Sequence, residues 1–152
     1  MALDQLDIRI LSILQKNNLT PQREIGQAVC LSAAAVQRRI KRMEESGVIM
    51  ANIAVADPLR IGPFITLLVE VILDSEQVAQ IDQAKKRFIQ SPEVQQCYYV
   101  TGAVDFLLVI VVESMEAYEA LTRRLFFENP NVKRFNTFVS MDRVKTGLSV
   151  PL

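Results

Sequence analysis

The sequence contains no histidine, and only two of its 152 residues are cysteine. Without histidine the chain cannot form Ser–His or Cys–His nucleophile pairs, and it cannot bind a metal through imidazole. Cys30 and Cys97 stand far apart and match no metal-binding or redox spacing. The sequence also lacks a phosphate-binding loop and a dinucleotide-binding fingerprint. We therefore expect a protein that is not an enzyme, with no catalytic residues, no metal site and no cofactor.

Long hydrophobic runs are missing too. No apolar run reaches about 18 residues, the length that a membrane-spanning helix needs. The first residues, Met1-Ala2-Leu3-Asp4, lack the basic region and the apolar core of a secretory signal. Two distant cysteines fit a reducing compartment. The sequence therefore predicts a cytoplasmic protein without a membrane partner.

The net charge is zero, because 17 Lys and Arg balance 17 Asp and Glu, and this balance does not indicate nucleic-acid binding. The charge is unevenly placed, however. Residues 1–50 carry seven cations against five anions, and four of these cations lie between Arg38 and Arg42. A local cluster of this size binds DNA weakly by itself, since affinity grows with the number of phosphates neutralised. If the chain binds DNA, we expect several such clusters in one assembly.

The segment from Leu31 to Gly47 has the pattern of a single helix. Ser32 can accept hydrogen bonds from the free N–H groups of a first turn, and Gly47 can adopt the left-handed conformation that ends a helix. Val36, Ile40 and Met43 recur at helical spacing and form a narrow apolar stripe. The apolar stripe predicts one buried side and leaves the other side of the helix exposed.

The exposed side of this helix suits the major groove of DNA. At about 100° per residue, Ala34, Arg38 and Lys41 face away from the apolar stripe, with Gln37 beside them. Small side chains allow a close approach to the groove, and Gln or Arg can bond base edges. The candidate DNA-contacting residues are Ser32, Ala33, Ala34, Gln37, Arg38, Lys41 and Arg42. A surface helix with a solvated charged face is the alternative.

Two shorter helices are expected before this one. Asp4 and Asp7 form a pattern close to a capping box at the start of the first helix. Thr20-Pro21 starts the second helix, and a short turn leads from it to Ser32. Three short helices, the last two joined by a tight turn, form a helix-turn-helix. The sequence thus favours a DNA-binding headpiece over a helical module that binds protein.

Residues 51–152 follow a different pattern. Residues 51–63 hold two prolines and few charges and predict a strand-like linker. Strands are then expected over residues 64–73, 94–101, 106–112 and 133–144, with helices that begin after Ser75 and Ser114. The order β-α-β-β-α-β is the ferredoxin-like split unit, with an antiparallel sheet and both helices on one face. The sequence therefore predicts an α+β protein with a headpiece over 1–50, a linker over 51–63 and a ferredoxin-like domain over 64–152.

The face of this sheet that carries no helix needs a cover, because its strands are strongly apolar. We expect a second copy of the chain to cover it, so that the protein is a homodimer. Coverage by the linker or by the C-terminal tail is the alternative.

Several motifs, taken in their order and spacing, resemble the Lrp/AsnC (feast/famine) family of prokaryotic transcription regulators. Leu3-Asp4-x-x-Asp7-x-x-Ile10-Leu11 is similar to the family's first helix, and Arg38-Arg39-Ile40-x-Arg42-Met43-Glu44 is similar to its recognition helix. Val100-Thr101-Gly102-Ala103-Val104-Asp105 is similar to its effector loop, and Leu148-x-Val150-Pro151-Leu152 to its C-terminus. The resemblance implies a regulator that binds double-stranded DNA, homodimers that assemble into octamers, and amino-acid effectors bound where dimers meet.

Two positions depart from the family's pattern. Cys30 stands where the family usually has glycine, in the turn before the recognition helix, and we expect a slight distortion of that turn. Val104 stands where an aromatic residue is common, which leaves the identity of the effector open and favours a small or aliphatic one.

The hairpin loop Thr101–Asp105 is the candidate effector site. Gly102 lets the backbone approach a ligand, Thr101 offers a hydroxyl, and free N–H groups in a turn can hold a carboxylate. Asp105 is either a partner for an α-ammonium group or an organiser of the loop. The expected effector-binding residues are Thr101, Gly102, Ala103, Val104 and Asp105, with Thr137 and Ser140 on the opposite wall. An ordinary hairpin is the alternative, and a small-molecule enzyme on the ferredoxin-like half rests on fold analogy alone.

Overall fold

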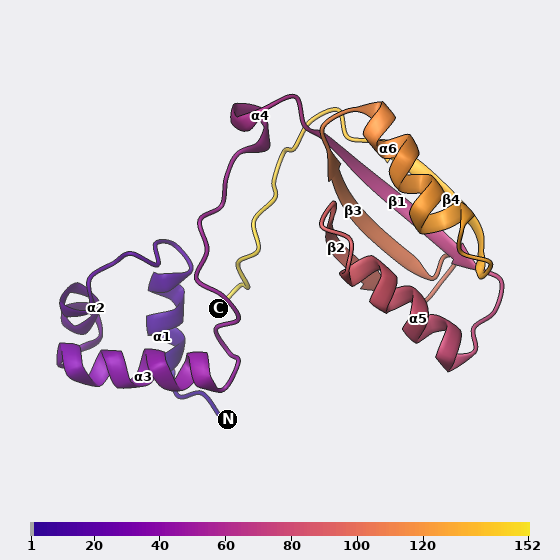
Figure 1. Cartoon of the computed structure of the whole chain (residues 1–152). Helices are drawn as coiled ribbons and strands as arrows, with labels where there is room; N and C mark the ends of the chain where they lie inside the picture. The colour runs from indigo at the N-terminus through magenta and orange to yellow at the C-terminus, as the bar shows by residue number, and fades with distance from the viewer. Residues whose placement is uncertain (1) are drawn as a thin grey trace. The chain divides into compact units, whose positions relative to one another are not determined.

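The computed structural model describes residues 2–152 (Figure 1) and divides them into two compact units. One unit runs to Val55 and also contains Thr146–Leu152, and the other is Ala56–Lys145. The C-terminal tail thus groups with the N-terminal helices, whereas the sequence assigns it to the second domain. The division into a headpiece over 1–50, a linker over 51–63 and a domain over 64–152 stays a prediction. Within residues 2–152, no helix is long and apolar enough to cross a membrane.

The first unit contains three helices, α1 (Gln5–Leu14), α2 (Gln22–Val29) and α3 (Ala33–Glu45). Their apolar sides meet in one core, whose most deeply buried members are Ile10, Ile25, Val29, Val36 and Met43. The predicted helix-turn-helix is therefore confirmed, and Val36 and Met43 turn the apolar stripe of α3 inward as its spacing predicts.

Hydrogen bonds at the starts of α1 and α3 follow the capping signals of the sequence, whereas α2 begins at Gln22, after Pro21, without the side-chain cap expected from Thr20. The Asp4 carboxylate accepts the N–H of Asp7 at 2.8 Å, and the Asp7 carboxylate accepts the N–H of Asp4 at 3.1 Å. The hydroxyl of Ser32 accepts the N–H of Ala35 at 3.2 Å. Gly47, which follows the C-cap residue Ser46 of α3, has a φ of 75°. The capping side chains satisfy free N–H groups at the starts of α1 and α3, and Gly47 allows α3 to end. Residues close in the sequence therefore determine these three helix ends.

The turn between α2 and α3 is tight. A Cβ atom added to Gly26 would lie 2.5 Å from the carbonyl oxygen of Leu31, so a larger residue would force the turn apart. Cys30 ends α2 in the left-handed conformation, with φ 58° and ψ 45°. Cys30 thus holds a left-handed backbone conformation, and this conformation costs a non-glycine residue about 1–2 kcal/mol relative to glycine.

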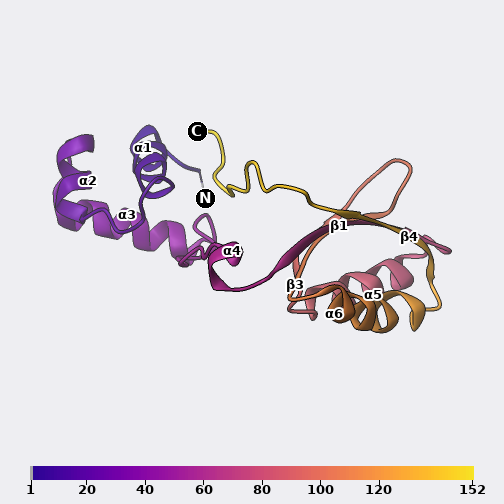
Figure 2. The ribbon, with the colours of Figure 1, turned by 90° about the horizontal axis from the view of Figure 1, so that it is seen from above.

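The second unit begins with the short helix α4 (Pro58–Ile61) and contains a four-stranded sheet with two long helices. Its elements are β1 (Ile65–Leu73), α5 (Val78–Ile89), β2 (Val94–Tyr99), β3 (Phe106–Val112), α6 (Met115–Thr122), the π-helical turn η1 (Arg123–Phe127) and β4 (Val132–Val139). The strand order is β2-β3-β1-β4, and all three pairings are antiparallel. Both α5 and α6 lie on one side of the sheet (Figure 2), which confirms the ferredoxin-like α+β arrangement.

The two faces of the sheet differ in burial. Alternate residues of β1 and β3, such as Leu67, Val69 and Leu108, pack against Phe88 of α5 and Phe126 of η1 in one core. On the other face, Leu68, Tyr98, Leu107 and Phe138 are all exposed by 39% or more. No segment of Ala56–Lys145 covers this uncovered face.

Residues 51–63 form no strand within the described part of one chain, and the strand-like linker stays a prediction. Residues 51–57 belong to no helix or strand, and Pro58–Ile61 form one helical turn, α4. A strand needs a hydrogen-bonded neighbour, and residues 51–57 have none within residues 2–152. Asp57 accepts the N–H of Leu59 and precedes a proline at the first helical position, a combination that favours a helix start.

Candidate nucleic-acid interface and effector loop

The outward side of α3 presents most of the residues that the sequence singles out. Ser32, Ala33, Ala34, Gln37, Arg38 and Lys41 are all exposed, while Val36 and Met43 on the inward side are fully buried. Within residues 2–152, Arg38 forms no ion pair. Lys41 approaches Glu45 at 3.7 Å, but both side chains are more than 60% exposed, so this pair holds the lysine weakly. Two cations of this face are thus available to a ligand.

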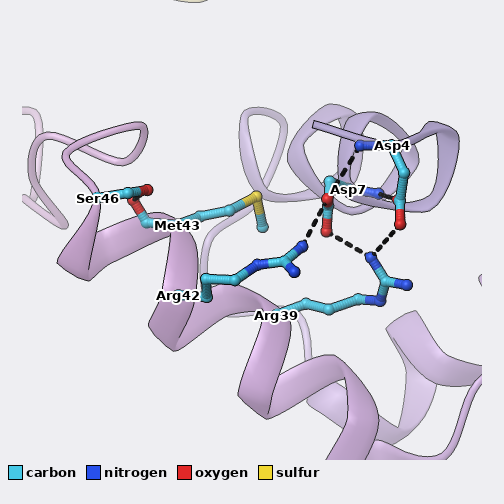
Figure 3. A network of polar contacts seen from close by, with 6 residues as sticks. All are labelled: Asp4, Asp7, Arg39, Arg42, Met43 and Ser46. Atoms are coloured by element: carbon cyan, nitrogen blue, oxygen red, sulfur yellow. Dashed lines mark hydrogen bonds and ion pairs between the residues drawn. The ribbon is translucent and has the colours of Figure 1, made fainter. Parts of the chain in front are cut away.

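The inner flank of α3 carries a different set of charges (Figure 3). Arg39 bonds both Asp4 and Asp7 at 2.7 Å, and Arg42 bonds the second oxygen of Asp7 at 2.8 Å. The side chain of Asp7 is fully buried, while that of Arg42 is half exposed. The N–H of Asp7 and the Arg39 guanidinium lower the pKa of Asp4, and the carboxylates of Asp4 and Asp7 raise the pKa of Arg39. We call this set of four residues the Asp7 network.

The Asp7 network links the start of α1 to the middle of α3. A buried carboxylate is tolerated only when it is paired and hydrogen-bonded, and here each oxygen of Asp7 has an arginine. Arg42, which the sequence assigns to DNA, is committed to this contact inside the protein. Its guanidinium therefore contributes to the orientation of α3 relative to α1.

Sequence reasoning misses the contact between Arg39 and Asp7, although the position of Arg39 on the helix carries a signal for it. At about 100° per residue, Arg39 lies about 60° from Val36, at the border of the apolar stripe. An arginine at that border can reach a neighbouring helix. The partner carboxylate, 32 residues earlier, carried only the signal of a helix cap.

The loop from Thr101 to Asp105 joins β2 to β3. The N–H of Val100 donates to the carbonyl of Asp105, and the N–H of Asp105 donates to the carbonyl of Val71. One carboxylate oxygen of Asp105 accepts the N–H of Leu73 at 2.7 Å. Asp105 therefore organises the loop against the end of β1, which is one of the two roles that the sequence left open.

The tip of this loop is open. Thr101, Gly102 and Ala103 are exposed, while Val104 and Asp105 are half-buried. Gly102 has a φ of 132°, and within residues 2–152 no heavy atom beyond its own and those of its two chain neighbours lies within 4 Å of the position that its Cβ would take. The other oxygen of Asp105, Oδ1, takes part in no hydrogen bond of residues 2–152. The backbone of Gly102 and one carboxylate oxygen are thus available to a small polar molecule.

Within one chain Thr137 and Ser140 do not form one wall, and their place on the opposite wall of a site between dimers stays a prediction. Side chains alternate along a strand, so residues three apart point to opposite faces. Thr137 lies opposite the core residue Val69 and shares a hydrogen bond with the hydroxyl of Tyr118 on the helix side. Ser140 donates its N–H to Thr66, at the end of β1 away from Leu73. Neither residue meets the loop within one chain.

A hollow of about 340 Å³ is lined by Glu70, Ile72, Arg134, Phe135 and Asn136. Glu70 and Ile72 lie on the uncovered face of β1, just before the residue that bonds Asp105. The sequence analysis selects none of these residues. Along the chain these residues show the pattern of an ordinary half-exposed strand. Only the pairing of β1 with β4 brings Glu70, Arg134 and Asn136 together.

Comparisons with known proteins agree with both units. Residues 3–50 match a family model described as winged helix-turn-helix DNA-binding, and residues 66–150 match the Lrp/AsnC ligand binding domain. An HTH-type transcriptional regulator of Sinorhizobium fredii is 41% identical over 152 residues, which cover all of this chain and 90% of that protein. The leucine-responsive regulatory protein of Haemophilus influenzae is 31% identical over 144 residues, covering 95% of this chain and 87% of that protein.

A solved structure shows the same arrangement of elements. The crystal structure of an AsnC family transcriptional regulator from Agrobacterium tumefaciens has a TM-score of 0.87 and 30% sequence identity. The match covers 98% of this chain and 97% of that chain. The chain therefore belongs to the Lrp/AsnC family of helix-turn-helix transcriptional regulators.

Proposed function

We propose that this regulator binds double-stranded DNA through the outward side of α3, as a homo-oligomer whose assembly responds to an amino acid or a related carboxylate. The observation that carries the DNA-binding part is the division of charge on α3. Arg39 and Arg42 hold the helix to Asp7, while Arg38 and Lys41 stay on the exposed side. A helix fixed in this way presents its free cations in a defined direction.

Each residue of the outward side has a distinct proposed role. Ala33 and Ala34 keep the helix close to the groove, and Gln37 and Arg38 bond base edges. Ser32 and Lys41 contact phosphates, since a hydroxyl at a helix start and a lysine serve positioning rather than base reading. Arg42 is proposed to orient the helix through Asp7.

Arg38→Ala should weaken binding to a preferred duplex by about 1–3 kcal/mol, because a bidentate contact to a base is lost. Lys41→Ala should weaken binding to all duplexes alike and lower the slope of log affinity against log salt by about 1. The preferred duplex is first selected from a random library with the full-length protein, and affinities are then measured by mobility shift at several salt concentrations.

Lys86→Ala, on α5 of the other unit, is the matched control and should leave both quantities unchanged. Unchanged affinity at low salt for both Arg38→Ala and Lys41→Ala would show that α3 is not the recognition helix.

We propose homodimerisation through the uncovered sheet face and further assembly toward octamers. Leu68, Leu107 and Phe138 on this face stay exposed within the chain, and an apolar patch of this kind is typical of an interaction surface. A dimer also meets the need for more than one headpiece, because one cluster of few cations binds DNA weakly.

The proposed effector site is the loop Thr101–Asp105, placed at a seam between dimers. A zwitterion needs donors for its carboxylate and an acceptor for its ammonium group. The open backbone at Gly102 and the hydroxyl of Thr101 supply donors, and Oδ1 of Asp105 supplies the acceptor. The family model for this unit describes a ligand-binding domain, and a leucine-responsive relative supports an amino acid as the ligand.

At least one of the twenty amino acids, at millimolar concentration, should raise the melting temperature of the full-length protein, since a ligand that binds only the folded state stabilises it. Gly102→Val should abolish this shift by blocking the loop. Asp105→Asn is the sharper variant, because an amide oxygen can still accept the N–H of Leu73 while the negative charge is gone.

If Asp105 pairs with an ammonium group, Asp105→Asn should weaken the ligand by about 2–5 kcal/mol, with the melting temperature of the free protein unchanged. If the ligand binds Asp105→Asn as tightly as the wild type, the charge-partner role is wrong. If all twenty amino acids leave the melting temperature and the assembly size unchanged, the effector proposal is wrong.

A further inference from the structure

The C-terminal tail makes a defined contact with α1. The N–H of Val150 donates to Oε1 of Gln15 at 2.7 Å, and Nε2 of Gln15 donates to the carbonyl oxygen of Val150 at 3.0 Å. A single side-chain amide thus bonds both backbone groups of one residue. Paired residues of antiparallel strands exchange the same two bonds. Gln15 directly follows α1 as its C-terminal cap residue.

The tail sequence explains why Val150 can make this contact. Pro151 disfavours helical backbone at the residue before it and pushes Val150 toward an extended conformation. In extended backbone the N–H and the carbonyl of one residue point to the same side, so both reach one amide. Glutamine is the right partner, because it carries a donor and an acceptor together.

The tail starts beside the entry of the linker into the sheet. β1 and β4 are neighbouring antiparallel strands, with Leu67 opposite Val139, and the N–H of Ser140 bonds the carbonyl of Thr66 at 2.9 Å. The chain that enters β1 and the chain that leaves β4 are therefore held together at one end of the sheet. Residues 146–152 then belong to the compact unit that contains α1, α2 and α3. Two peptide connections, instead of one, join this end of the sheet to the DNA-binding unit.

From these contacts we infer that residues 146–152 are a strap that docks on α1 through Gln15 and couples the sheet to the DNA-binding helices. The coupling rests on the proposed DNA-binding function, whereas the docking does not. With the strap attached, a change at the β1–β4 end of the sheet acts on the headpiece through both connections. With the strap released, only the linker connects the headpiece to the sheet, and the headpiece is less preorganised for DNA binding.

Hydrogen exchange of the Val150 amide in the full-length protein tests the docking. The amide should exchange more slowly than in an unstructured peptide, and Gln15→Ala should speed its exchange about five- to tenfold, as expected for loss of one or two exposed hydrogen bonds. Gln5→Ala, an exposed glutamine on the same helix with no hydrogen bond from its side chain within residues 2–152, is the matched control and should leave the rate unchanged. Exchange of Val150 at the unstructured rate in the wild type, or equal rates in both variants, would overturn the strap.

Mobility shift on a random-sequence duplex tests the coupling. Gln15→Ala and a chain that ends at Thr146 should both bind several-fold more weakly than the wild type and Gln5→Ala. A protected Val150 amide with unchanged DNA affinity in both variants would overturn the coupling. Absence of DNA binding in the wild type would instead overturn the proposed function. The hydrogen-exchange experiment would still decide whether the strap docks on α1.

Discussion

The double substitution Arg39→Met, Arg42→Met should lower the free energy of unfolding of the three-helix unit by about 3–5 kcal/mol. Both arginines of the Asp7 network are then gone, and the fully buried carboxylate of Asp7 has no cation left. The cost is that of an uncompensated charge in the core, which exceeds the value of the ion pairs themselves. A three-helix unit of this size has a small free energy of unfolding. We therefore expect this unit of the double variant to be largely unfolded at 25 °C.

Urea unfolding followed by the helical circular dichroism signal measures this loss. Arg38→Met is the matched control, because Arg38 lies on the same helix and forms no ion pair within residues 2–152, and its change should stay within about 0.5 kcal/mol. Arg42→Met alone should cost less than the double substitution, because Arg39 still bonds both Asp4 and Asp7.

A third substitution separates charge burial from lost packing. Adding Asp7→Leu to the double variant removes the buried charge, and it should restore at least half of the lost stability. If the triple variant is no more stable than the double variant, the loss comes from packing and not from an unpaired carboxylate. If the double variant unfolds like Arg38→Met, the Asp7 network does not hold α1 to α3.

Leu68→Asp should dissociate the proposed homodimer, with an increase of the dimer Kd of about a hundredfold or more. Leu68 lies on the uncovered sheet face between Val109 of β3 and Phe138 of β4. A carboxylate among these apolar side chains would be buried without a partner on association, and that burial is strongly unfavourable. Sedimentation velocity of the full-length protein at micromolar concentration measures the change.

Val78→Asp is the control for this substitution, since Val78 is an equally apolar residue, 74% exposed, on the helix-covered side of the sheet. It should leave the dimer intact. Association of the wild type should persist at high salt, because burial of apolar surface drives it. A monomeric wild type, or a Leu68→Asp variant that sediments as the wild type does, would contradict pairing through this face.

The sequence by itself determined the elements and much of their burial. Asp4, Asp7, Ser32 and Gly47 mark helix ends because each signal acts within three or four residues along the chain. The apolar stripe of α3 shows which of its side chains turn inward, because this period follows from helix geometry. The order of strands and helices then leaves the ferredoxin-like arrangement as the natural way to cover one face of the sheet.

The tertiary structure alone decided which polar groups meet. Of the arginines on α3, it directs Arg39 and Arg42 to Asp7 and leaves Arg38 exposed, and it turns one oxygen of Asp105 toward Leu73. It also joins Gln15 to Val150 across 135 positions of the chain. No local pattern encodes such contacts, because each depends on the relative placement of elements that are distant in sequence. The same reason places Thr137 on the helix side of the sheet within one chain, since strand pairing, and not composition, decides which end and which face of the sheet a side chain occupies.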